Sequence, residues 1–175
     1  MYKKIASKKI FVHPRITLIE DTVELPDGTQ TEYLRYQETR DTVIVLCKRA
    51  DGKFLLTDDY SYPVGGKLLK LPGGGLEQGE SPESGANREL MEEAGYRALA
   101  LQSLGQYYFN DRRNDVKTYI FYADTLVKER LTGDVEEVID VQWFSETEIE
   151  SMIRDNKIQH VHTLAVWSKY KIMMR

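Results

Sequence analysis

Residues 71–96 read LPGGGLEQGESPESGANRELMEEAGY, and this stretch decides the fold of the chain. It opens with a proline and three glycines and passes through an acidic turn into a carboxylate-rich segment. Ser81 suits the N-cap of a helix, Pro82 suits the first helical position, and Gly95 suits the left-handed residue that ends a helix. The stretch therefore predicts a loop, a helix and a second loop.

The predicted helix has two chemically different faces. At about 100° per residue, small and apolar side chains fall on one side: Ala86, Leu90, Met91 and Ala94. Glu89, Glu92 and Glu93 share an arc of roughly 100° on another side, where like charges destabilise a bare helix. We expect Arg88 to neutralise one of these carboxylates but not all three. The arc is either a solvated acidic face or a site for a hard cation such as Mg²⁺, which takes oxygen ligands.

The spacing of the defined residues in this stretch resembles the Nudix box. Gly74 is followed by five residues and Glu80, and then by seven residues and the run RELMEEAG at positions 88–95. Only Tyr96 departs, because a plain aliphatic residue is usual there. The resemblance implies a Nudix hydrolase, a family that hydrolyses nucleoside diphosphates linked to another moiety. It also implies the α/β (α+β) Nudix fold, in which a mixed β sheet is sandwiched between helices.

Turn signals and hydrophobic periodicity predict the remaining elements. A short antiparallel sheet is expected within residues 8–36, with a turn at Pro26-Asp27-Gly28. Further strands are expected at residues 42–48, 54–57, within 96–108, 116–124 and 138–144. We expect a loop over residues 58–66, a helix capped by Ser145 and Glu148, and a last helix from about residue 161 to 172.

Outside the box, the chain is similar to the branch of ADP-ribose and nucleotide-sugar pyrophosphatases. We expect an N-terminal antiparallel sheet extension over residues 1–38 and a Nudix hydrolase domain over residues 39–175. Members of this branch usually form dimers in which the N-terminal sheet of one subunit helps to build the other's active site. Residues 17–36 would then lie at a homodimer interface. The alternative is that they pack only on their own domain.

Composition excludes several classes of partner. The 175 residues carry 24 basic and 28 acidic side chains, so the formal net charge of −4 offers no basic field for nucleic acid or an anionic membrane. No apolar run is long enough to span a bilayer, and no signal peptide is recognisable. Cys47 is the only cysteine and lies in an apolar run, which excludes an internal disulfide and predicts a buried thiol. A cytoplasmic location is the default expectation.

The resemblance assigns roles within the box. Glu89 and Glu93 would hold metal ions together with the backbone carbonyl of Gly73, and the metal would be Mg²⁺, with Mn²⁺ as an alternative. Glu92 would assist, and Arg88 would orient a carboxylate rather than touch the substrate. Cleaving a phosphoanhydride needs cations that absorb charge on the phosphate oxygens, which suits this ligand set.

A further acid outside the box often completes the site in this branch. Glu137 is the first choice for this base or extra ligand, and Glu136 is the reserve. The alternative for either residue is a solvated glutamate in an acidic loop. Glu80, inside the box, is expected to be structural.

The sequence indicates the substrate less clearly than the metal site. Tyr60 could stack on a base or sugar, although tyrosines that alternate in strands more often belong to the core or to an interface. Arg112 and Arg113 could supply positive charge, although surface arginines are common. Asp58 and Asp59 would repel a pyrophosphate unless they point away. We expect Mg²⁺-dependent hydrolysis of ADP-ribose or a related nucleoside diphosphate sugar. The alternatives are GDP-mannose, a dinucleotide or a nucleoside triphosphate as substrate, and a non-catalytic nucleotide-sugar-binding domain.

Overall fold

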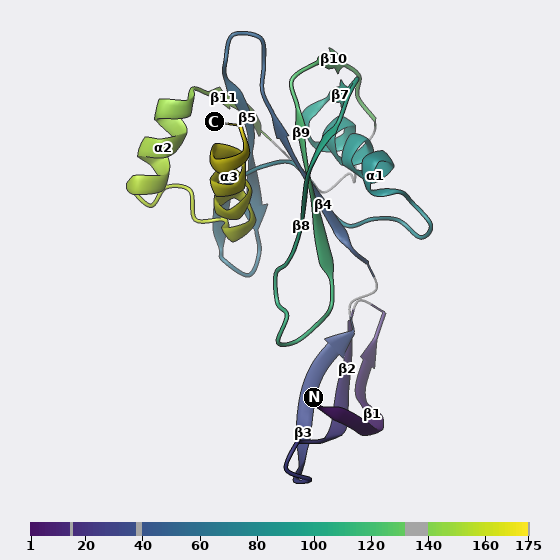
Figure 1. Cartoon of the computed structure of the whole chain (residues 1–175). Coiled ribbons are helices and arrows are strands. Elements are labelled where there is room, and N and C mark those ends of the chain that lie inside the picture. Colours follow the sequence, from purple (N-terminus) through teal and green to yellow (C-terminus); the bar gives the residue numbers. More distant parts are fainter. Residues whose placement is uncertain (15, 38–39, 132–139, 175) are drawn as a thin grey trace. The chain divides into compact units, whose positions relative to one another are not determined.

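The computed structural model describes residues 1–14, 16–37, 40–131 and 140–174 (Figure 1). The chain forms two compact units, which are described separately. One comprises residues 1–41 and 108–117, and the other comprises residues 42–107 and 118–175. Among the described residues, no helix is long and apolar enough to cross a membrane.

The first unit is built on a three-stranded antiparallel sheet with β2 (Ile16–Glu24) between β1 (Lys3–His13) and β3 (Gln30–Gln37). The expected turn joins β2 to β3, with a hydrogen bond of 3.0 Å from the Gly28 amide to the Leu25 carbonyl. Gly28 has φ of 84°, which a glycine adopts without strain.

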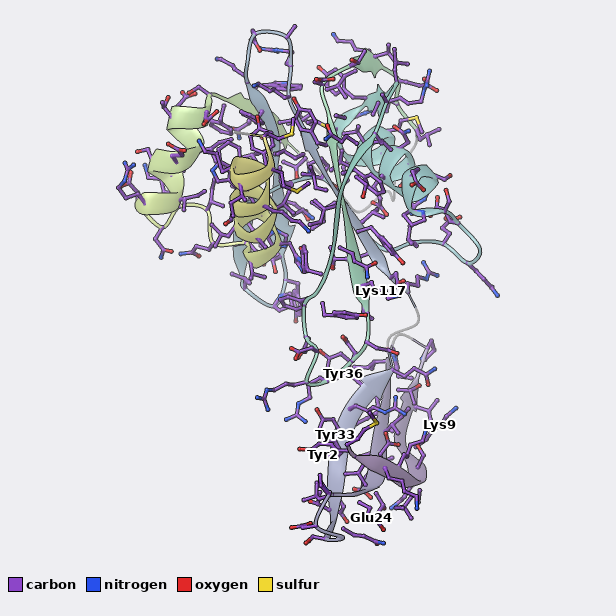
Figure 2. The ribbon with its side chains drawn as sticks, viewed as in Figure 1. Tyr2, Lys9, Glu24, Tyr33, Tyr36 and Lys117 are labelled. Atoms are coloured by element: carbon purple, nitrogen blue, oxygen red, sulfur yellow. The ribbon has the colours of Figure 1, made fainter. Side chains whose placement is uncertain are left out.

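The loop at residues 108–117 packs on β3 of the same unit. The Tyr33 hydroxyl donates to the Arg112 carbonyl at 2.6 Å, and the Tyr36 amide donates to the Arg113 carbonyl at 3.0 Å. Arg113 Nη1 in turn donates to the Leu34 carbonyl at 2.7 Å. Tyr33 and Tyr36 are labelled on β3 in Figure 2. Hydrogen bonds therefore attach this loop to the N-terminal sheet.

The second unit is organised on a parallel pair of strands, β4 (Thr42–Cys47) and β9 (Lys117–Ala123), with β8 (Gln102–Tyr108) on the other side of β9. Side chains alternate along β4, so Val43 and Val45 enter one hydrophobic cluster while Ile44 and Leu46 enter another. A strand that is apolar on both faces is typical of a sheet covered on both sides.

Helices cover both faces of these strands (Figure 1). On one face lie α1 (Pro82–Glu89) and its π-helical continuation η1 (Leu90–Ala94), which bury Ala86, Leu90 and Ala94. On the other face lie α2 (Glu146–Arg154) and α3 (Val161–Met173), which bury Ile149, Val166 and Trp167. The predicted arrangement of a mixed sheet between helices is confirmed.

Two further sheets complete the second unit. One pairs β10 (Leu126–Lys128) with β7 (Tyr96–Ala98), and the other has the order β11 (Asp140–Phe144), β5 (Phe54–Ser61), β6 (Gly66–Lys70). The loop expected over residues 58–66 is confirmed only at residues 62–65, because β5 continues to Ser61 and forms a hairpin with β6, which begins at Gly66. Asp58 and Asp59 are therefore strand residues, and their side chains form ion pairs with Lys67 and Lys70 of β6.

The glycine-rich loop is held against the backbone of β4. The Val43 amide donates to the Gly74 carbonyl at 2.9 Å, and the Val45 amide donates to the Pro72 carbonyl at 3.0 Å. Between them Gly73 has φ of 152°, and a Cβ at this position would lie 2.1 Å from the Val43 carbonyl oxygen. Only a residue without a side chain permits this approach.

We expect Gly73→Ala to lower the free energy of unfolding by about 3 kcal/mol or more, because the added methyl group meets strand backbone that cannot move aside. The measurement is urea denaturation followed by circular dichroism. Gly79→Ala is the matched control, because Gly79 also has positive φ (78°) but open space around it, so the cost is about 1–2 kcal/mol. Equal losses for the two variants would contradict the role given to the close contact.

Candidate active site

The helix that carries the box begins and ends as predicted. Ser81 Oγ accepts a hydrogen bond of 3.2 Å from the Ser84 amide, and Pro82 occupies the first turn. Gly95 ends the helix in the left-handed conformation, with φ of 71°. The π-helical turn before Gly95 was not predicted, and it carries two of the three carboxylates in question, Glu92 and Glu93.

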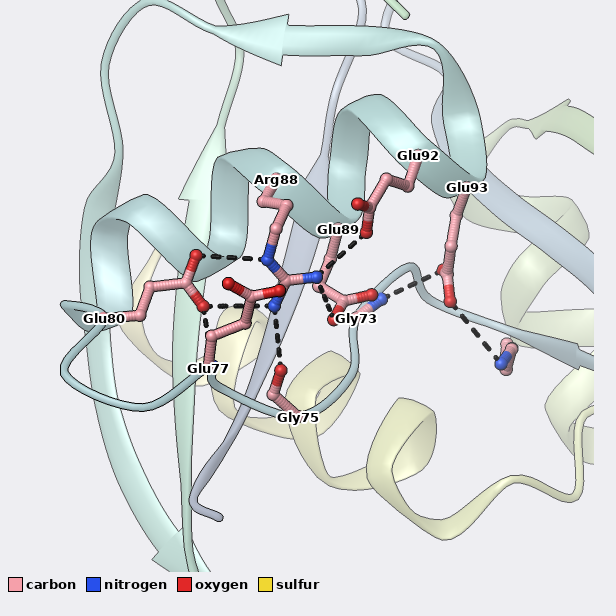
Figure 3. Close-up of polar contacts among 9 residues, drawn as sticks. Gly73, Gly75, Glu77, Glu80, Arg88, Glu89, Glu92 and Glu93 are labelled. Atoms are coloured by element: carbon pink, nitrogen blue, oxygen red, sulfur yellow. Dashed lines mark hydrogen bonds and ion pairs between the residues drawn. The ribbon is translucent and has the colours of Figure 1, made fainter. Parts of the chain in front are cut away.

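Two carboxylates of this helix converge on the glycine-rich loop (Figure 3). Glu93 Oε2 accepts a hydrogen bond of 3.1 Å from the Gly73 amide. The Glu89 carboxylate lies against Gly74, because a Cβ built on Gly74 would be 2.6 Å from Glu89 Oε1. Glu93 is 5% exposed, so it belongs to the interior rather than to a solvated face. The structure therefore brings Gly73, Glu89 and Glu93 together.

Arg88 contacts three carboxylates, and two of them, Glu89 and Glu92, belong to the acidic arc of the helix. Its Nε and Nη2 donate to the two oxygens of Glu80, each at 3.1 Å. Its Nη1 donates to Glu89 Oε1 and Glu92 Oε2, both at 2.9 Å, and Nη2 also donates to the Gly75 carbonyl at 2.8 Å. Figure 3 shows these hydrogen bonds of the Arg88 guanidinium. Arg88 thus fixes the carboxylates in place, in agreement with an orienting role.

The contact between Arg88 and Glu80 favours the charged form of both groups. The hydrogen bond from Arg88 lowers the pKa of the Glu80 carboxyl below its usual value, despite the opposing effect of burial. The same hydrogen bond raises the pKa of the Arg88 guanidinium further above neutrality. Glu80 also accepts from the Glu77 amide at 2.9 Å, as suits the structural role expected of it.

The residues present fit a hard divalent cation. Glu89, Glu93 and the Gly73 carbonyl offer only oxygen atoms, which Mg²⁺ and Mn²⁺ prefer. In the part of the chain that the structure describes, no three histidine, cysteine, aspartate or glutamate side chains form a metal-binding group by themselves. A cation at this place would therefore take ligands from the loop backbone and from water or substrate as well as from two carboxylates.

A lysine from β6 stands beside Glu93. Lys70 Nζ lies 3.8 Å from Glu93 Oε1 and 2.7 Å from Asp59 Oδ2. Asp58 has a similar partner, because its Oδ2 lies 3.4 Å from Lys67 Nζ. The two aspartates that seemed unfavourable for an anionic substrate are thus each compensated by a lysine of the neighbouring strand.

The start of α3 holds the segment that precedes the box. The buried Leu71 amide donates to Thr163 Oγ1 at 3.0 Å, and the same hydroxyl lies 3.0 Å from His160 Nδ1. Burial, followed by the charges of His162 and Lys70, lowers the pKa of His160 to about 4. His160 is therefore a neutral partner of Thr163 at physiological pH.

Five further residues were predicted for the site: Tyr60, Arg112, Arg113, Glu136 and Glu137. Tyr60 lies on β5 and is 58% exposed. Arg112 and Arg113 belong to the first unit, where they line a pocket of about 380 Å³ together with Arg35. Glu136 and Glu137 lie outside the described residues. Substrate-binding and base roles for these residues remain predictions.

The sequence analysis did not predict Lys70 or Thr163 as residues near the site. For Lys70 a signal was present, because two adjacent aspartates on one strand face a return strand that carries two lysines. For Thr163 no local signal exists, since its partner Leu71 is 92 residues away in the chain. Such a contact requires the three-dimensional fold.

Relatives of this chain include two pyrophosphatases and a dehydrogenase activator. The chain is 32% identical to an ADP-ribose pyrophosphatase of Bacillus subtilis, over 79% of this chain and 76% of the relative. It is 30% identical to a GDP-mannose pyrophosphatase of Yersinia enterocolitica, over 79% and 78%. It is also 29% identical to a methanol dehydrogenase activator of Bacillus methanolicus, over 93% and 88%.

The fold and the family are shown by two further comparisons. A crystal structure of an ADP compounds hydrolase superposes with a TM-score of 0.90, at 22% identity, over 97% of this chain and 92% of the other. The family model described as NUDIX domain matches residues 38–165, which include the whole box and the core cluster that packs against α1. The chain therefore belongs to the Nudix family, and it is a Nudix pyrophosphohydrolase.

Proposed function

We propose that this enzyme hydrolyses the pyrophosphate bond of ADP-ribose or a related nucleoside diphosphate sugar in a Mg²⁺-dependent reaction. The products are a nucleoside monophosphate and a sugar phosphate. The observation that carries the proposal is the convergence of Glu89 and Glu93 on the backbone of Gly73 and Gly74. Mn²⁺ is the alternative metal, because it accepts the same oxygen ligands.

The chemistry divides between the metal and the protein. A bound divalent cation supplies positive charge that stabilises the phosphate oxygens and the leaving group. In this proposal Glu89, Glu93 and the Gly73 carbonyl hold that cation. Arg88 keeps Glu89 and Glu92 in fixed orientations through its two bonds of 2.9 Å, and Glu92 assists.

Glu137 is proposed as the general base that takes a proton from the attacking water, with Glu136 as the reserve. Hydrolysis adds this water's oxygen to one phosphorus atom, and the bond from that phosphorus to the bridging oxygen breaks. A carboxylate within reach of the water removes the proton that would otherwise oppose attack. The support for Glu137 is its place in the sequence, shortly before β11.

The substrate class is supported by the relatives, one an ADP-ribose pyrophosphatase and another a GDP-mannose pyrophosphatase. GDP-mannose is therefore the second candidate. Arg112 and Arg113 are proposed to bind the anionic substrate, since guanidinium groups suit phosphates, and Tyr60 is proposed to stack on its base or sugar. Pairing of Asp58 and Asp59 with lysines weakens the objection that these acids would repel a pyrophosphate.

We further propose a homodimer in which residues 1–38 act as a dimerisation element of the Nudix domain at residues 39–175. Support comes from β1, an exposed strand at the edge of its sheet that carries exposed apolar side chains: Ile5, Ile10, Phe11 and Val12.

A cytoplasmic location is proposed because the single cysteine is buried and forms no internal disulfide. The net charge of −4 argues against nucleic acid or membranes as partners.

Incubation of the protein with ADP-ribose and Mg²⁺ is expected to give AMP and ribose 5-phosphate, separated by anion-exchange chromatography. Glu93→Gln should reduce turnover by at least about a hundredfold, because it removes a ligand charge while nearly keeping the side-chain shape. Glu83→Gln is the matched control, since Glu83 is an exposed residue of the same helix and should leave the rate unchanged.

Two results would contradict this proposal. A Glu93→Gln variant as active as the parent would remove the metal role from Glu93. Cleavage of GDP-mannose without cleavage of ADP-ribose would keep the reaction type and replace the substrate.

Glu137→Gln should lower kcat by about a hundredfold and leave KM nearly unchanged, because a base acts in the chemical step rather than in binding. The measurement is a steady-state rate profile against substrate concentration. Glu129→Gln serves as control, because Glu129 is an exposed glutamate whose ion pair with Arg97 lies on the surface. An unchanged kcat for Glu137→Gln together with a loss for Glu136→Gln would move the role to Glu136.

A further inference from the structure

Lys70 lies between two carboxylates, one of which belongs to the box. Its Nζ is 2.7 Å from Asp59 Oδ2 and 3.8 Å from Glu93 Oε1. The side chains of Lys70, Asp59 and Glu93 are 19%, 22% and 6% exposed, so the three charges are poorly screened by water. Thr57 Oγ1 donates to the Lys70 carbonyl at 3.2 Å, which fixes the lysine backbone at the end of β6.

This geometry exerts two opposing effects at Glu93. The ammonium group of Lys70 and the Gly73 amide both stabilise the negative charge of the nearly buried Glu93 carboxylate. A divalent cation bound to the same carboxylate would be repelled by that ammonium group. Asp59 offsets the repulsion, because it carries the opposite charge and lies closer to Lys70 than Glu93 does.

We propose that Lys70 is a built-in counter-ion of Glu93 that weakens divalent-cation binding at the box, and that Asp59 limits this effect by holding the ammonium group. The inference rests on the proposed metal role of Glu93 and extends it, because it assigns the control of metal affinity to a pair outside the box. Lys70 is thus a positioning residue that acts through Glu93.

A purely structural role for Lys70 makes a different prediction. If Lys70 only held the strand and the loop together, its removal would disturb Glu93 and weaken cation binding. Removal of a counter-ion strengthens cation binding instead, because the competing positive charge is gone. The sign of the change in affinity therefore separates the two roles.

The test is titration of the full 175-residue chain with Mn²⁺ alone, with free Mn²⁺ measured by electron paramagnetic resonance at about 0.15 M ionic strength. Lys70→Met should raise the Mn²⁺ affinity about tenfold, and Asp59→Asn should lower it about tenfold. In the double variant most of the Asp59→Asn effect should vanish, because that effect operates through Lys70. Thermal unfolding verifies that each variant is folded, and Lys70→Gln replaces Lys70→Met if the latter does not fold.

The neighbouring pair on the same hairpin provides the matched control. Lys67 and Asp58 are 3.4 Å apart with side chains 51% and 26% exposed, so solvent screens their charges more strongly. Lys67→Met and Asp58→Asn should therefore change Mn²⁺ affinity by no more than about twofold. Lys70→Arg keeps the charge and should remain close to the parent protein.

The possible failures are distinguishable. The counter-ion role would be overturned if Lys70→Met bound Mn²⁺ more weakly than the parent protein. It would also be overturned if Lys70→Met or Asp59→Asn left the Mn²⁺ affinity unchanged. Unchanged Mn²⁺ binding by Glu93→Gln would instead overturn the metal role of Glu93 on which the proposed function depends. Loss of binding in Glu93→Gln with opposite shifts in the Lys70 and Asp59 variants is the result we expect.

Discussion

Direct backbone contact between the glycine-rich loop and β4 is the constraint on which the rest of the site depends. Hydrogen bonds from Val43 and Val45 to this loop enclose Gly73, where a side chain would collide with the strand. The Gly73 amide in turn binds Glu93. One face of β4 packs against α1, and the other face packs against α3. Because the same strand contacts the loop and α1, it sets the position of both.

Charge balance is the second condition for this arrangement. Three carboxylates on one helix, with Glu80 nearby, would repel each other and would resist burial. Arg88 binds three of the four, and Lys70 stands beside the remaining one, Glu93. Two side-chain cations, one inside the box and one outside it, thus compensate part of the charge of the four carboxylates.

Local signals predicted much of this structure. Ser81 and Gly95 marked the ends of the box helix because capping depends on adjacent residues, and the same holds for the capping box of Ser145 and Glu148. The parallel pairing of β4 with β9 and the bond between Leu71 and Thr163 join distant segments, so they followed only from the fold. The hairpin of β5 and β6 was missed because the second half of β5, residues 58–61, is polar and lacks hydrophobic alternation.

The buried thiol of Cys47 has a practical consequence. It is the only cysteine in the chain, it is fully buried on β4, and burial raises its pKa well above the usual value. A thiol in this state does not react with alkylating reagents while the strand is covered. The rate of its modification by such a reagent would therefore report how often the central strand opens, and a single natural residue would serve as a probe of local unfolding beneath the site.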